Sequence, residues 1–361
     1  MKIKRDKNIC MVLAVVLSLS ILSACNSGGA DISSSSSPDS IQEPGSMNAS
    51  VAVSSLPDEP EKPAEPENTE QQESPVIPDG PPVVYMTSDV SPAGLIAVYE
   101  ALGREAAGSV AVKINTGEPG AKYFLSPDLI KDFVQTVDGT IVECNTMSGF
   151  NGRRSSTAMH YQVAQDHGYT AIAPVLILDE EGDLTIPVTN GTHLTENTIG
   201  AHFADFDFHV VLSHFKGKDA TGFGGAITNM SMGYASAKGK ELIHDVDKSS
   251  SPAFLEAMAE VAKSVADYAG ENILYINVMN NLSINCDCRS NPAAPTMADV
   301  GILASTDPIA LDKACVDLVY AAPDGQDLIR HIESRDSMRV LEHSVEIGFG
   351  SLEYELVSID A

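Results

Sequence analysis

His209-Val-Val-Leu-Ser-His-Phe-Lys-Gly-Lys-Asp-Ala-Thr-Gly-Phe-Gly-Gly-Ala-Ile-Thr-Asn-Met-Ser-Met-Gly233 is the stretch around which the rest of the chain is organised. It begins as an apolar strand and ends in a loop that is dense in glycine, with two His and two Lys at the junction. In α/β proteins, ligands usually bind just past the carboxyl ends of strands. The stretch therefore predicts a binding site at a strand end, without indicating a reaction.

Strand and helix patterns alternate on both sides of this stretch. Apolar strands are predicted at 83–86, 109–115, 140–144, 272–279 and 300–305, and helices at 92–102, 127–136, 156–167, 251–270 and 308–320. Two further extended segments, 171–175 and 184–188, contain Pro and are expected at sheet edges. The alternation predicts an α/β fold whose largely parallel or mixed sheet has helices on both faces.

Polar residues at the ends of the predicted strands are the candidate ligand-binding residues. The glycine loop is expected to expose backbone N–H groups at a helix N-terminus, where anions bind. The glycines equally suit a tight turn or close packing, and the order of residues is neither a Walker loop nor a dinucleotide-binding fingerprint. His209, within the strand, is interpreted as structural. The candidates are His214, Lys216, Gly222, Gly224, Gly225, Asn229, Glu143 and Asn115.

Cysteine spacing indicates a second kind of chemistry. Cys286 and Cys288 point to the same side of an extended segment. Together with Asp287 between them and with His214, they are the candidate metal ligands. In an oxidising compartment they are expected to pair with each other or with Cys144 and Cys315. The sequence leaves both alternatives open. A metal ion is the cofactor that these residue types suggest, and no ferredoxin-type cluster is expected because the repeated Cys-x-x-Cys run is absent.

The N-terminal residues 1–24 are typical of a bacterial lipoprotein signal peptide. A basic start precedes the apolar run Met11–Leu22, which is too short for a comfortable membrane span, and Leu22-Ser-Ala-Cys25 follows. We expect Cys25 to be lipidated and the protein to be anchored on the extracytoplasmic face of the cell membrane. The alternative is an ordinary cleaved signal peptide followed by a chance Cys.

Residues 25–82 are rich in Ser, Pro and acidic side chains and are expected to form a disordered tether. Between residues 31 and 80, 11 acidic residues face Lys62 alone. The remaining residues, 83–361, are expected to form the α/β domain, with 17 basic and 38 acidic residues. Because of this negative charge, nucleic acid is not an expected partner. The expected partners are the membrane, through the lipid on Cys25, and a small-molecule ligand.

Several long motifs carry a family resemblance. Ser213-His-Phe-Lys-Gly217, Gly222-Phe-Gly-Gly-Ala226, Met232-Gly233, Cys286-Asp-Cys288 and the segment 299–312 strongly resemble the domain of unknown function 362 family. The resemblance covers residues 83–361. Members are often labelled iron–sulfur centre proteins, and many contain a ferredoxin-type module that this chain lacks. The glycine-rich segment also resembles the lactate racemase family, whose site uses His and Lys beside such a loop.

Two positions depart from the family pattern. Lys218 stands where members usually have the second His of His-Phe-Lys-Gly-His, and Thr228 stands where they usually have Lys. If the family site binds a metal through the His pair, this chain has lost one ligand. These departures also motivate a third hypothesis, a degenerate member with a structural or interaction role.

Together these patterns predict a lipid-anchored extracytoplasmic protein with a metal- or redox-linked site at the glycine-rich strand-end loop. The alternative is a non-catalytic surface lipoprotein that binds a small anionic or polar molecule. Whether the chain is an enzyme stays open; oxidoreduction is the class expected if it is.

Overall fold

The computed structural model describes residues 80–147 and 152–360. The predicted signal peptide 1–24, the expected lipidation site Cys25 and nearly all of the predicted tether 25–82 lie outside the described residues. Within the described residues, no helix combines the length and apolar character needed to cross a membrane.

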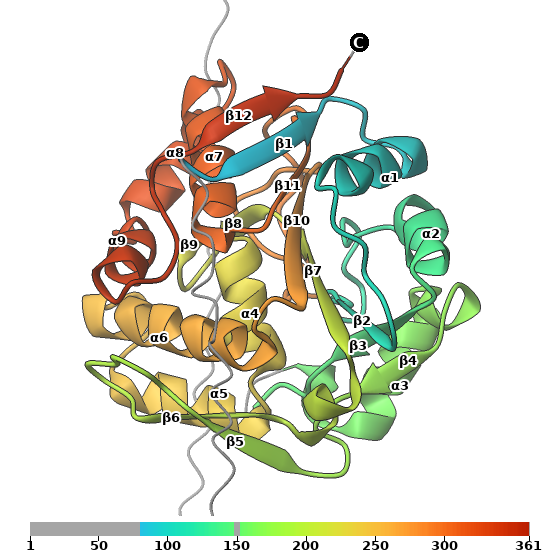
Figure 1. The fold of residues 1–361 in the computed structure, drawn as a ribbon, viewed down its shortest axis with the longest axis vertical. Helices are drawn as coiled ribbons and strands as arrows, with labels where there is room; N and C mark the ends of the chain where they lie inside the picture. The colour runs from blue at the N-terminus through green and yellow to red at the C-terminus, as the bar shows by residue number, and fades with distance from the viewer. Residues whose placement is uncertain (1–79, 148–151, 361) are drawn as a thin grey trace, which may run out of the picture. The chain divides into compact units, whose positions relative to one another are not determined.

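One large sheet organises the described residues (Figure 1). Its eight strands within those residues are β1 (Val83–Thr87), β2 (Val110–Lys113), β3 (Gly139–Glu143), β4 (Val175–Ile177), β7 (Phe208–His214), β10 (Ile273–Met279), β11 (Gly301–Ser305) and β12 (Glu355–Ser358). The order across the sheet is β12-β1-β11-β10-β7-β2-β3-β4. From β10 to β4 every pairing is parallel, whereas β11 is antiparallel to both neighbours. The predicted mixed, largely parallel sheet is confirmed.

Helices cover both faces of this sheet. Helices α1 (Pro92–Ala101) and α2 (Pro127–Thr136) lie on one side, and α4 (Ala226–Tyr234), α6 (Pro252–Ala269) and α7 (Pro308–Ala321) lie on the other (Figure 1). Strand β2 shows how the sequence produces two cores. Val110 and Val112 pack in the core beneath α1 and α2, while Ala111 between them faces the opposite core. A strand buried on both faces reads as a continuous apolar run.

The remaining elements lie around these layers. They are α3 (Thr157–Asp166), α5 (Ala237–Val246), α8 (Gln326–Glu333), α9 (Arg339–Glu346), the pair β5 (Asp183–Pro187) and β6 (Glu196–Gly200), and the pair β8 (Lys216–Lys218) and β9 (Gly222–Gly224). Helices α5 and α9 both contact α6. The short β8–β9 hairpin directly follows β7, so the family motif around His214 forms a strand end and a hairpin.

Ser251 caps the start of helix α6 as expected. The Ser251 side chain accepts a hydrogen bond from the Phe254 N–H at 3.2 Å, Pro252 is the first helical residue, and the cap at Gly270 has a φ of 61°. The prediction for helix α6 is confirmed to within one residue at each end.

The predicted extended segment 171–175 is wrong in its position. Residues Tyr169–Ala171 form a 3₁₀ turn, and the N–H groups of Ile172 and Ala173 both donate to the Tyr169 carbonyl. These bonds keep the chain turned until Pro174, so the strand starts only at Val175. It does form an edge of the sheet, as Pro174 suggested.

The order of the strands creates a switch point between β2 and β7. Strands β2, β3 and β4 follow one another outward, whereas β7 lies on the other side of β2 and leads towards β10. The connections therefore diverge, and the carboxyl ends of β2 and β7 border a crevice where α/β proteins place ligands.

Candidate functional site

A cavity of about 570 Å³ lies at these carboxyl ends. The segments that follow β2, β3, β7 and β10 all contribute to its wall. Its volume lies in the range of small-molecule sites. The structure brings nine of the predicted site residues to this wall: Asn115, Glu143, His214, Lys216, Gly224, Gly225, Asn229, Cys286 and Cys288. Gly222 is not among the lining residues, and the ligand-binding role of the others stays a prediction.

The glycines of the central stretch serve the turn and its packing. Gly222 has a φ of +76°, and a Cβ there would lie 1.8 Å from the Ser337 Oγ. A Cβ on Gly225 would lie 2.3 Å from Oδ1 of Asp312. Both positions therefore exclude a side chain, the first by conformation and contact and the second by contact.

The backbone N–H array predicted for an external anion is satisfied within the protein. The N–H groups of Ala226 and Ile227, at the start of α4, donate to the Asp312 carboxylate at 2.8 and 3.0 Å. The Asn277 side chain donates to the same carboxylate at 2.7 Å. Asp312 is fully buried on α7, and burial raises its pKa to about 6. The expectation of an open anion site at this helix N-terminus is corrected accordingly.

Glu143 is the centre of a buried ion-pair network at one end of the wall. Its carboxylate accepts from the Lys113 ammonium at 2.8 Å, the Arg154 guanidinium at 3.1 Å and the Thr116 N–H at 2.8 Å. Burial acts to raise the pKa of Glu143, but Lys113, His160 and Arg154 outweigh it and hold the pKa well below its ordinary value. Glu143 is thus an ionised, fully engaged carboxylate.

The two predicted amides belong to the same framework. Asn115 Oδ1 accepts from Arg154 at 2.9 Å and from the Gly117 N–H at 3.0 Å. Asn229 Oδ1 accepts from Lys113 at 3.1 Å, and its amide nitrogen donates to the Ser213 hydroxyl at 3.1 Å. Both side chains therefore fix the positions of cavity cations.

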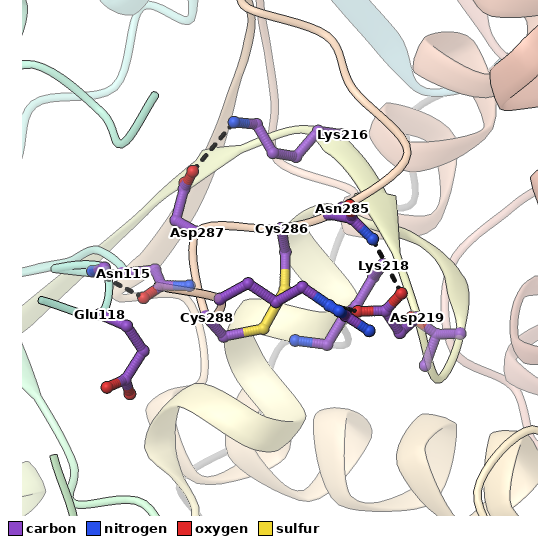
Figure 2. Close-up of a disulfide and its surroundings, with 12 residues drawn as sticks. Asn115, Glu118, Lys216, Lys218, Asp219, Asn285, Cys286, Asp287 and Cys288 are labelled. Atoms are coloured by element: carbon purple, nitrogen blue, oxygen red, sulfur yellow. Dashed lines mark hydrogen bonds and ion pairs between the residues drawn. A yellow bond between two sulfur atoms is a disulfide. The ribbon is translucent and has the colours of Figure 1, made fainter. Parts of the chain in front are cut away.

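The Asp287 carboxylate contacts two of the predicted residues in the cavity wall. Its carboxylate lies 2.8 Å from His214 Nδ1 and 2.9 Å from the Lys216 ammonium (Figure 2 shows the Lys216 contact). The other His214 nitrogen faces the Asn280 carbonyl at 2.8 Å. Since both partners are acceptors, the ring satisfies both contacts when each nitrogen bears a hydrogen. Burial acts to raise the pKa of Asp287, yet His214 and Lys216 lower it.

Lys218 and Lys240 are cavity cations without a bound carboxylate. Among the described residues no hydrogen bond or ion pair reaches the Lys218 ammonium, and the contacts of Lys218 with Gly222 and His331 involve its backbone. Lys218 is half-buried, and burial together with Arg154 lowers its pKa to about 8. Lys240 is buried and donates only to the carbonyls of Asn145 and Ala235. Their positive charges remain available to a ligand.

Cys286 and Cys288 are joined by a disulfide in the cavity wall (Figure 2). In this state neither sulfur is a thiolate, and both nitrogens of His214 are already engaged. The described residues contain no group of three or more His, Cys, Asp and Glu side chains able to hold a metal ion. The predicted metal ligands therefore do not fit a metal in the oxidised protein, and a metal at the reduced dithiol stays a prediction.

Two further His residues and two further Cys residues were considered in the sequence, and the structure places each of them. His209 is buried away from the cavity, stacks on Phe203 with ring centroids 3.8 Å apart and meets the Tyr234 hydroxyl, as the structural interpretation predicted. His244 lines the cavity. Cys144 and Cys315 are free and buried, and burial raises the pKa of Cys144 to about 12, so it is a poor nucleophile.

Sequence reasoning missed three lining residues that shape the site: Lys113, Arg154 and Lys240. A signal existed for Lys113, because it is a lysine inside an apolar strand. Arg154 and Lys240 have no such signal in the pattern. Asp287 was predicted as a possible metal ligand beside the two cysteines, and its carboxylate pairs with His214 and Lys216.

We compared the chain with curated proteins and with solved structures. No curated protein matches it. A lactate racemase apoprotein structure from Thermoanaerobacterium thermosaccharolyticum shares 13% identity and a TM-score of 0.34, over 54% of this chain and 50% of that one. A Thermotoga maritima protein structure shares 12% identity and a TM-score of 0.35, over 71% of this chain and 58% of that one. The chain thus spans between about half and three fifths of these structures.

The family comparison covers most of the sheet and the cavity wall. The model of the domain of unknown function DUF362 matches residues 110–317, which include the strands β2 to β11 and the motifs around His214 and Cys286. The match extends over more than half of the sequence. The chain belongs to the DUF362 family.

Proposed function

We propose that this protein binds a small organic anion in the cavity at the carboxyl ends of β2 and β7. The observation behind this proposal is the charge of the lining. Six Lys and Arg side chains face three Asp and Glu side chains there, namely Lys113, Arg154, Lys216, Lys218, Lys240 and Arg289 against Glu143, Asp219 and Asp287. The whole chain has a formal net charge of −28, so a cationic cavity is contrary to its average surface.

The ion pairs of the cavity cations also support an anionic ligand. Lys113, Arg154 and Lys216 are neutralised by buried carboxylates at contact distance. Lys218 and Lys240 have no such partner among the described residues. A buried cation without a counter-ion is costly, and an anionic ligand supplies the missing charge. The cavity is thus preorganised for an anion.

Apolar side chains indicate the rest of the ligand. Met232, Phe254 and Met258 line the same cavity, from helices α4 and α6. An apolar wall with a few placed charges is the usual composition of a small-molecule site. We therefore infer a carboxylate or phosphate group attached to an apolar portion.

The cellular setting is part of this proposal. The lipoprotein signal and Cys25 predicted from the sequence support anchoring on the extracytoplasmic face of the membrane, with the cavity presented by the α/β domain. The metal- or redox-linked activity predicted at the glycine-rich loop is a second candidate, and the disulfide in the wall favours its redox form.

Thermal unfolding of the full-length protein with matched ligands tests anion binding. Hexanoate and phenylacetate are compared with their neutral amides at low ionic strength. A ligand at one hundred times its Kd adds about 2.7 kcal/mol, which raises Tm by roughly 5–10 °C for a domain of this size. We expect the acids to stabilise the protein more than the amides do.

Two variants complete the experiment. Lys218→Gln removes an unpaired cavity charge and is expected to reduce the shift in Tm. Lys131→Gln removes an exposed charge from α2, outside the cavity, and is expected to leave the shift unchanged. Equal stabilisation by acids and amides, or equal effects of the two variants, contradicts the proposal.

A further inference from the structure

The Cys286–Cys288 disulfide is placed where a cavity ligand can reach it. Both residues line the cavity, in the loop that follows β10. Cys288 is half-buried, whereas Cys286 is 6% exposed. An incoming thiolate therefore has better access to the Cys288 sulfur, and the Cys286 sulfur is the natural leaving group.

Two cationic side chains, Lys218 and Arg289, lie near this disulfide. The side chain of Lys218 extends towards it, and no described residue neutralises that ammonium by direct contact (Figure 2). Arg289 follows Cys288 directly, also lines the cavity and pairs with Asp219. Positive charge beside a disulfide attracts thiolates and stabilises the thiolate that leaves.

The loop is anchored independently of the disulfide. Asp287, between the two cysteines, is held by His214 at 2.8 Å and by Lys216 at 2.9 Å, and its carbonyl accepts from the Glu118 N–H at 2.8 Å. Opening the disulfide leaves these contacts in place. The two sulfurs therefore stay on the cavity wall in the reduced protein, so that the reaction is reversible at one location.

From this arrangement we propose that the Cys286–Cys288 disulfide is reduced and re-formed by exchange with small anionic thiols bound in the cavity. The proposal rests on the anion-binding function proposed above and names a substrate class for it, namely carboxylate-bearing thiols.

The exchange balances in two steps. An external thiolate forms a bond with the Cys288 sulfur, the bond between the two protein sulfurs breaks, and Cys286 leaves as a thiolate. A second external thiolate attacks the external sulfur of the mixed disulfide and releases Cys288 as a thiolate. Two thiolates are oxidised to one disulfide, and the protein disulfide receives the two electrons. The reverse sequence re-forms the protein disulfide.

The test compares three thiols that differ in charge. The full-length protein is incubated with 3-mercaptopropionate, 2-mercaptoethanol or cysteamine, quenched by alkylation, and mapped by mass spectrometry to separate Cys286 and Cys288 from Cys144 and Cys315. Each rate is divided by the rate of the same thiol with 2-hydroxyethyl disulfide. After this correction we expect the anionic thiol to react about 10-fold faster than the cationic one, at the low end of electrostatic focusing in charged clefts.

Two further measurements keep the test independent of any one variant. Raising the salt concentration of the wild-type reaction is expected to reduce the anionic preference. Lys218→Gln is expected to reduce it about threefold, while Lys131→Gln leaves it unchanged. A corrected ratio near one, or a disulfide that none of the three thiols reduces, overturns the proposal.

Failure of this inference is distinguishable from failure of anion binding. Hexanoate, which has no thiol, is added in excess to the wild-type reaction and, separately, to the Cys286→Ser/Cys288→Ser variant in thermal unfolding. If hexanoate stabilises that variant and no anionic preference is seen in exchange, binding stands and thiol exchange is wrong. If hexanoate neither stabilises the variant nor slows reduction by 3-mercaptopropionate, both proposals are wrong.

Discussion

Replacing Glu143 with Gln removes the carboxylate that faces Lys113 and His160 in the buried network, and leaves Arg154 with Glu118 as its remaining carboxylate partner. The Gln amide keeps one acceptor oxygen, which continues to serve the Thr116 N–H at 2.8 Å and Arg154 at 3.1 Å. Its other end becomes an NH₂ group directed at the Lys113 ammonium, where Oε2 previously accepted at 2.8 Å. The substitution therefore sets donor against donor at a lysine that is 1% exposed.

The expected loss of unfolding free energy follows from the burial of the ion pair. Removing one partner of a buried ion pair typically costs 3–5 kcal/mol, because the other charge is left without compensation. Since the Thr116 and Arg154 contacts survive, we expect the low end, about 3 kcal/mol of unfolding free energy. For a domain of this size that loss corresponds to a fall in Tm of roughly 6–12 °C.

Denaturant unfolding at pH 7 measures this loss, and a double-mutant cycle assigns it. Lys113→Met removes the stranded charge, so Lys113→Met/Glu143→Gln is expected to be more stable than the sum of the single losses predicts, by about 2 kcal/mol. The contribution of Glu143 to the unfolding free energy also depends on pH in a defined direction. The pKa of Glu143 is held below its ordinary value, so its contribution is complete above the unfolded pKa of about 4.3 and is lost as pH falls through the lower folded pKa.

Two results refute this reasoning. A loss below about 1 kcal/mol for Glu143→Gln shows that solvent or relaxation compensates Lys113. Strict additivity in the cycle shows that Lys113 and Glu143 are not energetically coupled, whatever the distance between them.

Three further predictions concern the cavity and its support. Because the pKa of Lys218 is about 8, the affinity for hexanoate is expected to fall, by up to about 10-fold, as pH rises from 7 to 9; calorimetric titration checks this, and Lys218→Gln is expected to abolish the fall. The disulfide closes only a three-residue loop, so Cys286→Ser/Cys288→Ser is expected to cost about 1.6 kcal/mol in denaturant unfolding; a loss above 4 kcal/mol, on the order of a 100-residue loop, contradicts this entropy estimate. Asp312→Asn removes the buried carboxylate that accepts from the start of α4 and keeps one acceptor oxygen there. Because burial raises the Asp312 pKa to about 6, the wild type loses stability as pH rises from about 4 to 6 and the variant does not, which unfolding at several pH values detects.

The fold was largely predictable because its core elements are strongly patterned. The strand at 272–279 is a continuous apolar run, and the helix at 251–270 has helical spacing of apolar residues with capping residues at both ends. Both formed as expected. Helices α5, α8 and α9 and strand β12 were not predicted. Helices α5 and α9 pack on α6, and β12 pairs with β1, so these elements depend on tertiary contacts that the local pattern does not show.

The location of the site was predictable for a topological reason. His214 and Glu143 are the last residues of β7 and β3, and Asn115 follows β2, which lies between them. Because these strands are parallel, their carboxyl ends bring the three residues to one edge of the sheet. The pairings of these residues were not predictable. Asp287 was predicted only as a possible metal ligand. Only the packed structure shows that its carboxylate faces His214 and Lys216, and that the Asp312 carboxylate accepts from the start of α4.

The position of β1 has a consequence for how this protein is made. Strand β1 lies between β11 and β12, with Tyr85 beside Ala304 on one side and Val357 on the other. During synthesis from the N-terminus, both neighbours emerge long after β1 does. The nascent chain therefore displays an apolar strand with unpaired backbone groups until nearly all of the domain has left the ribosome. A chaperone that covers residues 83–87 would keep this strand from pairing with other chains during that interval.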